Sequence, residues 1–229
     1  MTASTLFENL RAFDTPTICN ALEIVRARRF ATGFTRQRLL AAWPALPPIV
    51  GYARTARLRC SVPCDPAMRR ETLLGYYEYV AKPPQPTITV IQDIDDLPGL
   101  GAFWGEVNST VHWGLGCHGV VTNGSMRDLD MMCPEFQCLA GTLTPSHVHA
   151  HVVDFGTPVD VFGMAVSHDD VVHADRHGAV VFTAAEAEHL PAAVDLMVRR
   201  ERVILEAARR PGFNAAEMRV AMTTSEQIT

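Results

Sequence analysis

The segment from residue 104 to residue 130 constrains the fold more than any other part of the sequence. Apolar residues on helical spacing begin after Glu106, two glycines end that helix, and an apolar run at 120–122 indicates a short buried strand. A helix of about ten residues rises roughly 15 Å, and a strand of about five residues covers roughly the same distance. The strand therefore brings the chain back to the height at which the helix began, and we expect Glu106, Arg127 and Asp128 to meet at one edge.

The edge predicted in this way combines groups that bind anions and hard cations. Backbone N–H groups at a helix start and the guanidinium of Arg127 bind anions, and carboxylates such as Asp128 bind oxygen-liganded metal ions. Between the strand and Arg127, Asn123 and Gly124 indicate a turn. An Arg-Asp pair alone is more often a surface ion pair or a turn, but its spacing from Glu106 favours a site for an anionic substrate and a metal ion.

Glu106, followed after twenty residues by Arg127 and Asp128, resembles the acidic-x20-Arg-Asp signature of one protein family. That family contains 4-hydroxy-4-methyl-2-oxoglutarate/4-carboxy-4-hydroxy-2-oxoadipate aldolases and the regulator of ribonuclease activity A, RraA. The resemblance covers nearly the whole chain: residues 16–22 are similar to the family's N-terminal helix, 51–56 to its first strand, 102–106 to its substrate loop, and 169–175 with 178–181 to its closing hairpin.

The order of the predicted elements indicates an α/β or α+β fold, because helices and strands alternate in the first half and strands prevail in the second. We expect one domain over residues 1–229, with N-terminal helices at 5–30, a C-terminal helical segment at 191–210 that Pro191 opens, and a tail beyond Gly212 that is loosely ordered at its end. The resemblance implies the family's swivelling β/β/α fold, which is similar to phosphohistidine domains. No Gly-x-Gly-x-x-Gly follows a predicted strand, which argues against a Rossmann nucleotide site.

The composition argues against several classes of protein. A net charge of −5 supplies no basic surface for phosphates, so we expect no nucleic-acid partner. No run approaches the roughly 18 apolar residues of a membrane span, and the start at 1–4 lacks a basic-then-apolar signal, so we expect a cytoplasmic protein without a membrane partner. Six cysteines without a CxxC pair indicate reduced thiols rather than disulfides or a zinc site.

The resemblance also implies roles for the residues of the motif. Asp128 would bind a divalent ion, Mg²⁺ or Mn²⁺, directly, and Arg127 would hold oxygens of the substrate. The backbone N–H groups of Val107 and Asn108 would bind the substrate's carboxylate. Glu106 stands where the family has Asp or Glu, and it would move a proton through water bound to the metal.

The function that the resemblance implies is that of a divalent-metal-dependent lyase. It would cleave 4-hydroxy-2-oxo acids of the 4-hydroxy-4-methyl-2-oxoglutarate or 4-carboxy-4-hydroxy-2-oxoadipate type to pyruvate, and it would decarboxylate oxaloacetate through the same enolate. Lys82, the only lysine, precedes a proline pair outside the motif, which favours metal over Schiff-base catalysis.

Assembly is a further implication of the resemblance. Members of the family form homotrimers, often paired into homohexamers, so we expect one of these assemblies. Glu201 is the best match for a glutamate that reaches the metal's water shell in a neighbouring subunit, although salt bridging along its own helix is the plain alternative.

Two other functions remain open on the sequence. The chain could be a non-catalytic regulator of the RraA type that binds a ribonuclease, since a regulator could retain the motif. It could also be a zinc hydrolase, because His147, His149 and His151 on a strand would share one face and could chelate zinc; a solvated or interface strand is the alternative. The acidic loop at 93–96 likewise admits either a metal site or turn-forming aspartates.

Overall fold

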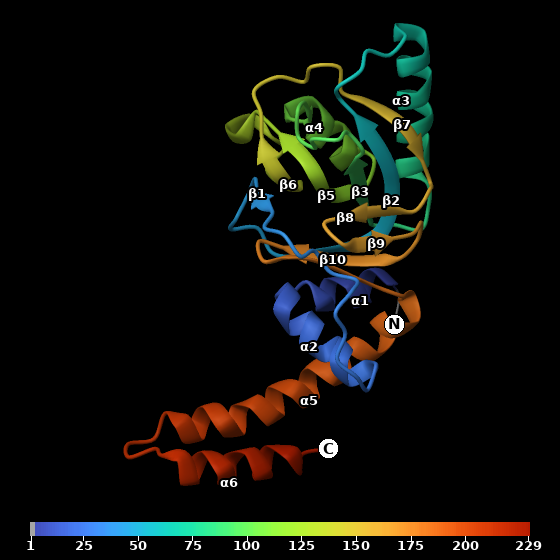
Figure 1. The fold of residues 1–229 in the computed structure, drawn as a ribbon. Coiled ribbons are helices and arrows are strands. Elements are labelled where there is room, and N and C mark those ends of the chain that lie inside the picture. Colours follow the sequence, from blue (N-terminus) through green and yellow to red (C-terminus); the bar gives the residue numbers. More distant parts are fainter. Residues whose placement is uncertain (1–2) are drawn as a thin grey trace.

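The computed structural model describes residues 3–229, so the first two residues of the predicted domain, where no signal was expected, lie outside it. Its main feature is a curled sheet with the strand order β1-β6-β5-β3-β2-β10-β11, in which β4 pairs with β5 and β7 with β2 (Figure 1). The strands of this sheet are β1 (Leu40–Ala41), β2 (Ile49–Arg59), β3 (Thr87–Asp93), β4 (Ala102–Trp104), β5 (Cys117–Met126), β6 (Gln137–Leu143), β7 (His151–Phe155), β10 (Val171–Asp175) and β11 (Gly178–Phe182). A separate hairpin consists of β8 (Val159–Val161) and β9 (Met164–Val166).

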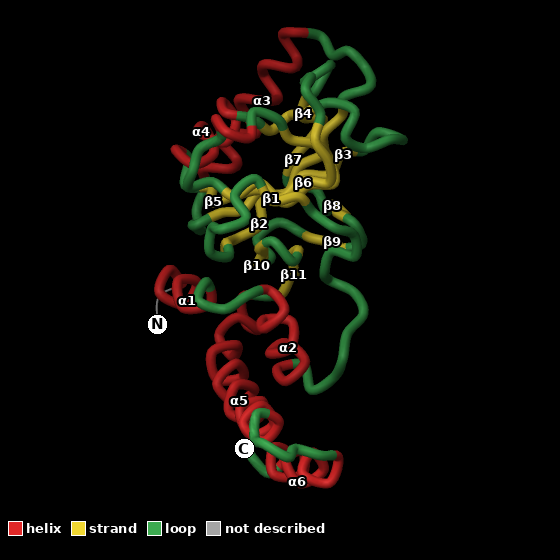
Figure 2. Tube along the Cα trace, turned by 90° about the vertical axis from the view of Figure 1, so that its left-hand side faces the viewer, coloured by secondary structure: helices red, strands yellow, loops and turns green. Residues whose placement is uncertain are grey.

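The helices lie at two ends of the sheet. They are α1 (Ala3–Leu10), α2 (Thr15–Val25), α3 (Pro66–Ala81), α4 (Glu106–Gly114), α5 (Ala184–Ala208) and α6 (Ala215–Glu226). Figures 1 and 2 show α3 and α4 beside the upper part of the sheet, and α1, α2 and the first part of α5 below β10 and β11. The mixed α/β class predicted from the sequence is confirmed. Of the helices within residues 3–229, none is both long enough and apolar enough to cross a membrane.

The centre of the sheet is parallel. β3 lies between β2 and β5, and β6 follows on the far side of β5. Nearly all of β3 is buried, as is typical of a parallel strand that is covered on both faces. Since the carboxyl ends of parallel strands share one edge, the residues that follow β5 emerge where open α/β sheets commonly bind ligands.

Asn123 and Gly124 do not form the predicted turn, because they lie inside β5. The pairing of β5 with β6 shifts register between Thr122 and Ser125, which marks a bulge. The Asn123 side chain accepts a hydrogen bond from the N–H of Asp93 (2.8 Å) and donates one to its carbonyl (2.9 Å). The N–H of Gly124 donates to Thr122 Oγ1 (2.9 Å). These contacts satisfy polar groups at the bulge, so the strand continues beyond it.

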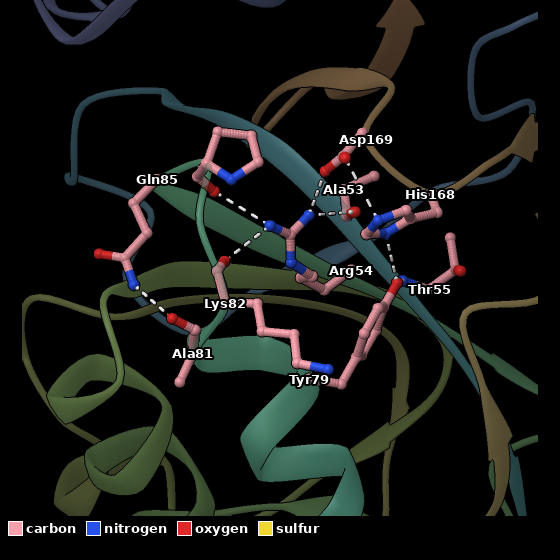
Figure 3. Close-up of polar contacts among 10 residues, drawn as sticks. Ala53, Arg54, Thr55, Tyr79, Ala81, Lys82, Gln85, His168 and Asp169 are labelled. Carbon is pink, nitrogen blue, oxygen red and sulfur yellow. Dashed lines mark hydrogen bonds and ion pairs between the residues drawn. The ribbon is translucent and has the colours of Figure 1, made fainter.

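Arg54, fully buried on β2, anchors the proline-rich loop between α3 and β3 (Figure 3). Its guanidinium donates to the carbonyls of Lys82 (2.8 Å) and Pro84 (3.0 Å) and pairs with the carboxylate of Asp169. The Tyr79 ring lies beside it, with the guanidinium carbon 5.7 Å from the ring centroid. A buried charge needs such partners, because an unpaired charge inside a protein is strongly destabilising.

The C-terminal helix begins earlier than predicted. α5 starts at Ala184, so Pro191 lies within the helix and not at its start. Thr183 and Glu186 form a capping box. In this box the Glu186 N–H donates to Thr183 Oγ1 (3.2 Å), and the Thr183 N–H donates to the Glu186 carboxylate (2.8 Å). Two otherwise unpaired N–H groups are satisfied at once, which fixes the helix start well before the proline.

The tail beyond Gly212 forms a helix, so the expectation of a loosely ordered end is wrong. α6 begins after Asn214, whose side chain accepts from the N–H of Ala216 (2.9 Å). It packs against α5, where Ser225 Oγ donates to the carbonyl of Arg200 (3.0 Å). The second half of α5 and all of α6 form a helical hairpin that leaves the body, and we call it the α5–α6 arm (Figures 1 and 2).

Candidate active site

Asp128 lies shortly after the end of β5 in a left-handed backbone conformation, with φ of 55°. Residues other than glycine rarely adopt this conformation, and such strain often occurs at functional sites. The Asp128 carboxylate lies against Gly105, because a Cβ atom at Gly105 would meet Asp128 Oδ2 at 2.5 Å. Glycine before α4 therefore leaves the room that this carboxylate occupies.

The first turn of α4 has N–H groups without a side-chain cap. The Glu106 N–H lies 3.4 Å from Asp128 Oδ2, and the first regular helical bond starts from the N–H of Ser109. The N–H groups of Val107 and Asn108 have no hydrogen-bond partner among residues 3–229. An uncapped helix start of this kind is suited to binding an anion.

Arg127 lies beside both this helix start and Asp128. Its N–H donates to the carbonyl of Trp104 (2.9 Å), and its Nε lies 3.7 Å from Asp128 Oδ2. The side chain is 37% exposed, so it is open to a ligand. The structure thus brings Glu106, Arg127 and Asp128 together at the carboxyl end of β5, as expected. The strand is longer than the expectation assumed, because β5 has ten residues and α4 has nine. The pairing of β4 with β5, which sets Trp104 opposite Met126, places these residues side by side.

Side chains beneath α4 hold its first turn in position. The Asn108 amide donates to the carbonyl of Phe103 (2.6 Å) and accepts from the hydroxyl of Tyr77 (2.7 Å). His112 is fully buried; its Nδ1–H donates to the Asn108 carbonyl (2.7 Å), and the Tyr76 hydroxyl lies 2.8 Å from its Nε2. Burial lowers the pKa of His112 to about 4, so the ring is neutral and its Nε2 accepts a hydrogen bond from the Tyr76 hydroxyl. The sequence analysis missed this support, because no local pattern marks a lone helical histidine as buried.

A cleft of about 160 Å³ opens beside Arg127. Asn108 lines it from α4, Arg69 from α3, and His147 and His151 from the segment that leads into β7. The sequence analysis did not single out Arg69. An exposed arginine on a helix carries no local signal, and its proximity to Arg127 is a product of the fold.

The histidine cluster does not form the predicted strand face. His147 and His149 lie in a loop, and β7 begins only at His151. Val148 has a φ of 44°, which breaks the alternation that would have aligned three rings. His147 and His151 line the cleft, whereas His149 does not. Within residues 3–229 the three rings do not gather their nitrogens within 4.8 Å of one another, which argues against the zinc site considered above.

Cys60, Asp93 and Asp95 are the one group in the described part of the chain whose possible ligand atoms lie within 4.8 Å of one another. Their polar atoms already have protein partners. The Asp95 carboxylate accepts from the N–H groups of Cys60 (2.7 Å) and Ser61 (2.8 Å). The Asp93 carboxylate accepts from the N–H of Gly99 (2.7 Å). Burial raises the pKa of the Cys60 thiol to about 12, which disfavours the thiolate that binds metals, so this group braces the loop after β3.

Asp128 suits a divalent ion better than that buried group does. Its side chain is 32% exposed and lies beside the open first turn of α4, with the exposed Glu106 as a second carboxylate there. Mg²⁺ and Mn²⁺ take oxygen ligands, and Mg²⁺ keeps several positions for water and substrate oxygens. One direct carboxylate with open surroundings matches that preference.

Two residues considered in the sequence analysis lie apart from this site. Glu201 is exposed on α5, which extends away from the end of the molecule where α4 lies (Figures 1 and 2). A contribution from Glu201 to the site would therefore have to come from a neighbouring subunit. Lys82 is exposed after α3 and is not among the residues that line the cleft.

Comparison with known proteins identifies the fold. A family model described as RraA-like, Aldolase/RraA, matches residues 15–181. An uncharacterized protein from Pseudomonas syringae pv. tomato str. DC3000 is 18% identical, with a TM-score of 0.73 over 97% of this chain and 95% of that one. Streptomyces coelicolor RraAS2, described as an unusual member of the RNase ES inhibitor RraA protein family, is 20% identical, with a TM-score of 0.67 over 91% of this chain and 98% of that one.

A third similar structure is described as belonging to novel cellulases from microbes associated with the gut ecosystem. It is 14% identical, with a TM-score of 0.71 over 88% of each chain. At such identities the likeness concerns the fold alone, and the fold implied by the resemblance is confirmed. No curated protein matches the sequence.

Proposed function

The chain belongs to the RraA-like (Aldolase/RraA) family, and we propose that it is a divalent-metal-dependent lyase that cleaves 4-hydroxy-2-oxo acids to pyruvate. The observation that carries the proposal is the position of Asp128, in strained backbone beside the uncapped turn of α4 and the guanidinium of Arg127. These groups match a substrate whose keto and carboxylate oxygens are neighbours. Acids of the 4-hydroxy-4-methyl-2-oxoglutarate and 4-carboxy-4-hydroxy-2-oxoadipate type are the proposed substrates, with oxaloacetate decarboxylation as an accompanying reaction.

Each residue has a defined part in the proposed reaction. The N–H groups of Val107 and Asn108 bind the C1 carboxylate at the positive end of the α4 dipole. Arg127 donates charge-assisted hydrogen bonds to the C2 oxygen, where negative charge grows as the C3–C4 bond breaks. The proton of the C4 hydroxyl leaves by way of Glu106 and a water molecule, and it returns to C3 of the pyruvate enolate.

Asp128 would hold a Mg²⁺ or Mn²⁺ ion, which when bound acts as a Lewis acid on the substrate's keto oxygen. Glu106, and Glu201 from a neighbouring subunit, would contact water around that ion. Schiff-base catalysis, the alternative to metal catalysis, would need a lysine in the cleft. Lys82 is the only lysine and does not line the cleft, which supports the metal-dependent chemistry.

Release of pyruvate tests the mechanism. The purified protein is assayed with 4-hydroxy-2-oxo acids and with oxaloacetate, first after EDTA treatment and then after Mg²⁺ is restored. We expect EDTA to abolish turnover and Mg²⁺ to recover it. Turnover that is indifferent to both treatments contradicts the metal-dependent mechanism, and no turnover of any of these acids with Mg²⁺ present contradicts the lyase.

A non-catalytic regulator is the alternative, favoured by the likeness to RraAS2, which is described as a member of an RNase inhibitor family. Such a protein would bind a ribonuclease and turn over no substrate. The strained Asp128 beside an uncapped helix start favours the lyase, because a surface that only docks a protein has no need of it. Stoichiometric capture of a ribonuclease without turnover of any 2-oxo acid would reverse this ranking.

A further inference from the structure

The cleft beside Arg127 contains basic groups, of which the proposed chemistry at Asp128 uses Arg127 alone. Two guanidiniums, those of Arg69 and Arg127, and two imidazoles, those of His147 and His151, line it. No Asp or Glu in the described part of the chain is among the lining residues, although the whole chain has a net charge of −5. A cleft of one charge sign on a protein of the opposite net charge concentrates ligands of complementary charge, here anions.

Of the two guanidiniums in this cleft, that of Arg69 has no role in the proposed reaction. Its backbone N–H donates to the carbonyl of Asp65 (2.8 Å) within α3, but its guanidinium has no hydrogen bond or ion pair with any residue of 3–229. Arg127, in contrast, lies 3.7 Å from Asp128 and is assigned to the 2-oxo end of the substrate. A free guanidinium offers five N–H donors in a planar fork that fits a carboxylate.

The two histidines are held with one ring nitrogen unused. His147 Nδ1 lies 2.9 Å from the carbonyl of Val148, and His151 Nδ1 lies 2.7 Å from the carbonyl of His149. Since a carbonyl oxygen only accepts, each Nδ1 carries the hydrogen, and each Nε2 is left for a ligand. Nε2 of the neutral ring only accepts, so each ring holds a carboxylate by donating from Nε2 in its protonated form.

The remaining walls suit a short carbon chain. Leu73, Ala150 and Val152 add apolar surface, and the volume of about 160 Å³ admits a small organic acid rather than a nucleotide or an oligosaccharide. A ligand with its 2-oxo end at Arg127, a few carbons in between and an anionic group at Arg69 would use every kind of group in the cleft.

We propose that Arg69, together with His147 and His151, binds a second anionic group of the substrate. The acids proposed above as substrates all carry such a group, a carboxylate at the far end of the chain, and these three side chains select for it. The inference rests on the proposed function for the direction of the ligand, because it assigns the 2-oxo end to Arg127 and Asp128. Arg69 is then a specificity-determining residue.

The test compares two acids that cannot be cleaved, since neither has a C4 hydroxyl. 2-Oxoglutarate and 2-oxopentanoate have the same number of carbons and differ only in a carboxylate or a methyl group at C5. Their affinities for the protein are measured by calorimetry in the presence of Mg²⁺. We expect 2-oxoglutarate to bind about tenfold or more tightly than 2-oxopentanoate, as one charge-assisted contact predicts.

Variants assign that preference to residues. Arg69→Gln should remove most of it by weakening 2-oxoglutarate alone, and His147→Gln and His151→Gln should each remove a part. Arg70→Gln, the next exposed arginine on α3, and His149→Gln, in the same loop as His147, should keep the parent's preference, because neither residue lines the cleft.

Binding of the two acids with equal affinity, binding of neither, or an equal loss of both in Arg69→Gln overturns the second anion site. Turnover is scored separately, so that the two proposals can fail independently. A protein that prefers 2-oxoglutarate but releases no pyruvate from any 4-hydroxy-2-oxo acid supports the second anion site and contradicts the lyase. A protein that releases pyruvate but does not prefer 2-oxoglutarate contradicts the second anion site and still supports the lyase.

Discussion

Arg127 contributes a planar guanidinium that can hold two oxygens at once, and a lysine cannot reproduce that geometry. Arg127→Lys keeps the charge beside Asp128 but loses one or two charge-assisted hydrogen bonds, each about 1.5–3 kcal/mol, so kcat/KM with oxaloacetate should fall about tenfold or more. Binding of Mn²⁺ without substrate should survive the change. A variant with the parent's kcat/KM would show that Arg127 does not contact the reacting oxygens.

His112 and His173 should make the fold sensitive to acid. Burial lowers the pKa of both rings from 6.5 to about 4. As the pH falls below 6.5, the unfolded chain takes up protons that the folded chain refuses until about pH 4. The free energy of unfolding should therefore fall across this window, by up to about 1.4 kcal/mol per pH unit for each ring.

Urea unfolding at several pH values checks this expectation. His112→Gln should show a shallower decline with falling pH than the parent, because one of the two buried rings is gone. His149→Gln removes an exposed ring and should leave the slope unchanged. Equal slopes for the parent and His112→Gln would contradict a neutral buried His112.

The start of α4 and the end of β5 form the element on which the site depends. Gly105→Ala would bring a Cβ within 2.5 Å of Asp128 Oδ2, at a φ of −169° that any residue adopts. We expect a folded protein whose kcat/KM is lower by about tenfold or more, because a displaced carboxylate misaligns the site. Gly114→Ala, at the other end of α4 with nothing within 4 Å, should keep activity and stabilise the helix by roughly 0.5–1 kcal/mol. Full activity in Gly105→Ala would separate Asp128 from catalysis.

The helices and strands also show which features of the fold and the site could be predicted from the sequence. The approach of Glu106 to Asp128 was expected from a helix and a strand of equal length, but β5 has ten residues, and the approach follows instead from the pairing of β4 with β5. The bulge at Asn123 could not be predicted, because its side chain bonds to a residue of the neighbouring strand. The same holds for Arg69 and His151, which reach one cleft only through the fold. The capping box at Thr183, in contrast, is a local pattern that could have located the start of α5.

At the scale of the whole molecule, the α5–α6 arm carries Glu201, which we propose completes the site of a neighbouring subunit. The arm leaves Leu205 and Val220 exposed (48% and 66%), and the trimer or hexamer implied by the resemblance would bring Glu201 of one subunit to Asp128 of another. Co-expression of Asp128→Ala and Glu201→Ala chains should then restore part of the activity that each variant lacks alone. Glu206→Ala, also exposed on α5, should be active by itself. An active monomer in sizing experiments would contradict the shared site.

Titration of Mn²⁺ into Asp128→Asn decides whether Asp128 is the direct ligand of a divalent ion. The substitution keeps the volume and one oxygen of the side chain but removes the charge that holds a hard cation. We expect Mn²⁺ affinity and turnover of oxaloacetate to fall together, while the exposed neighbour variant Asp130→Asn keeps both. If Asp128→Asn binds Mn²⁺ as tightly as the parent, Asp128 is not the ligand and the site assignment fails.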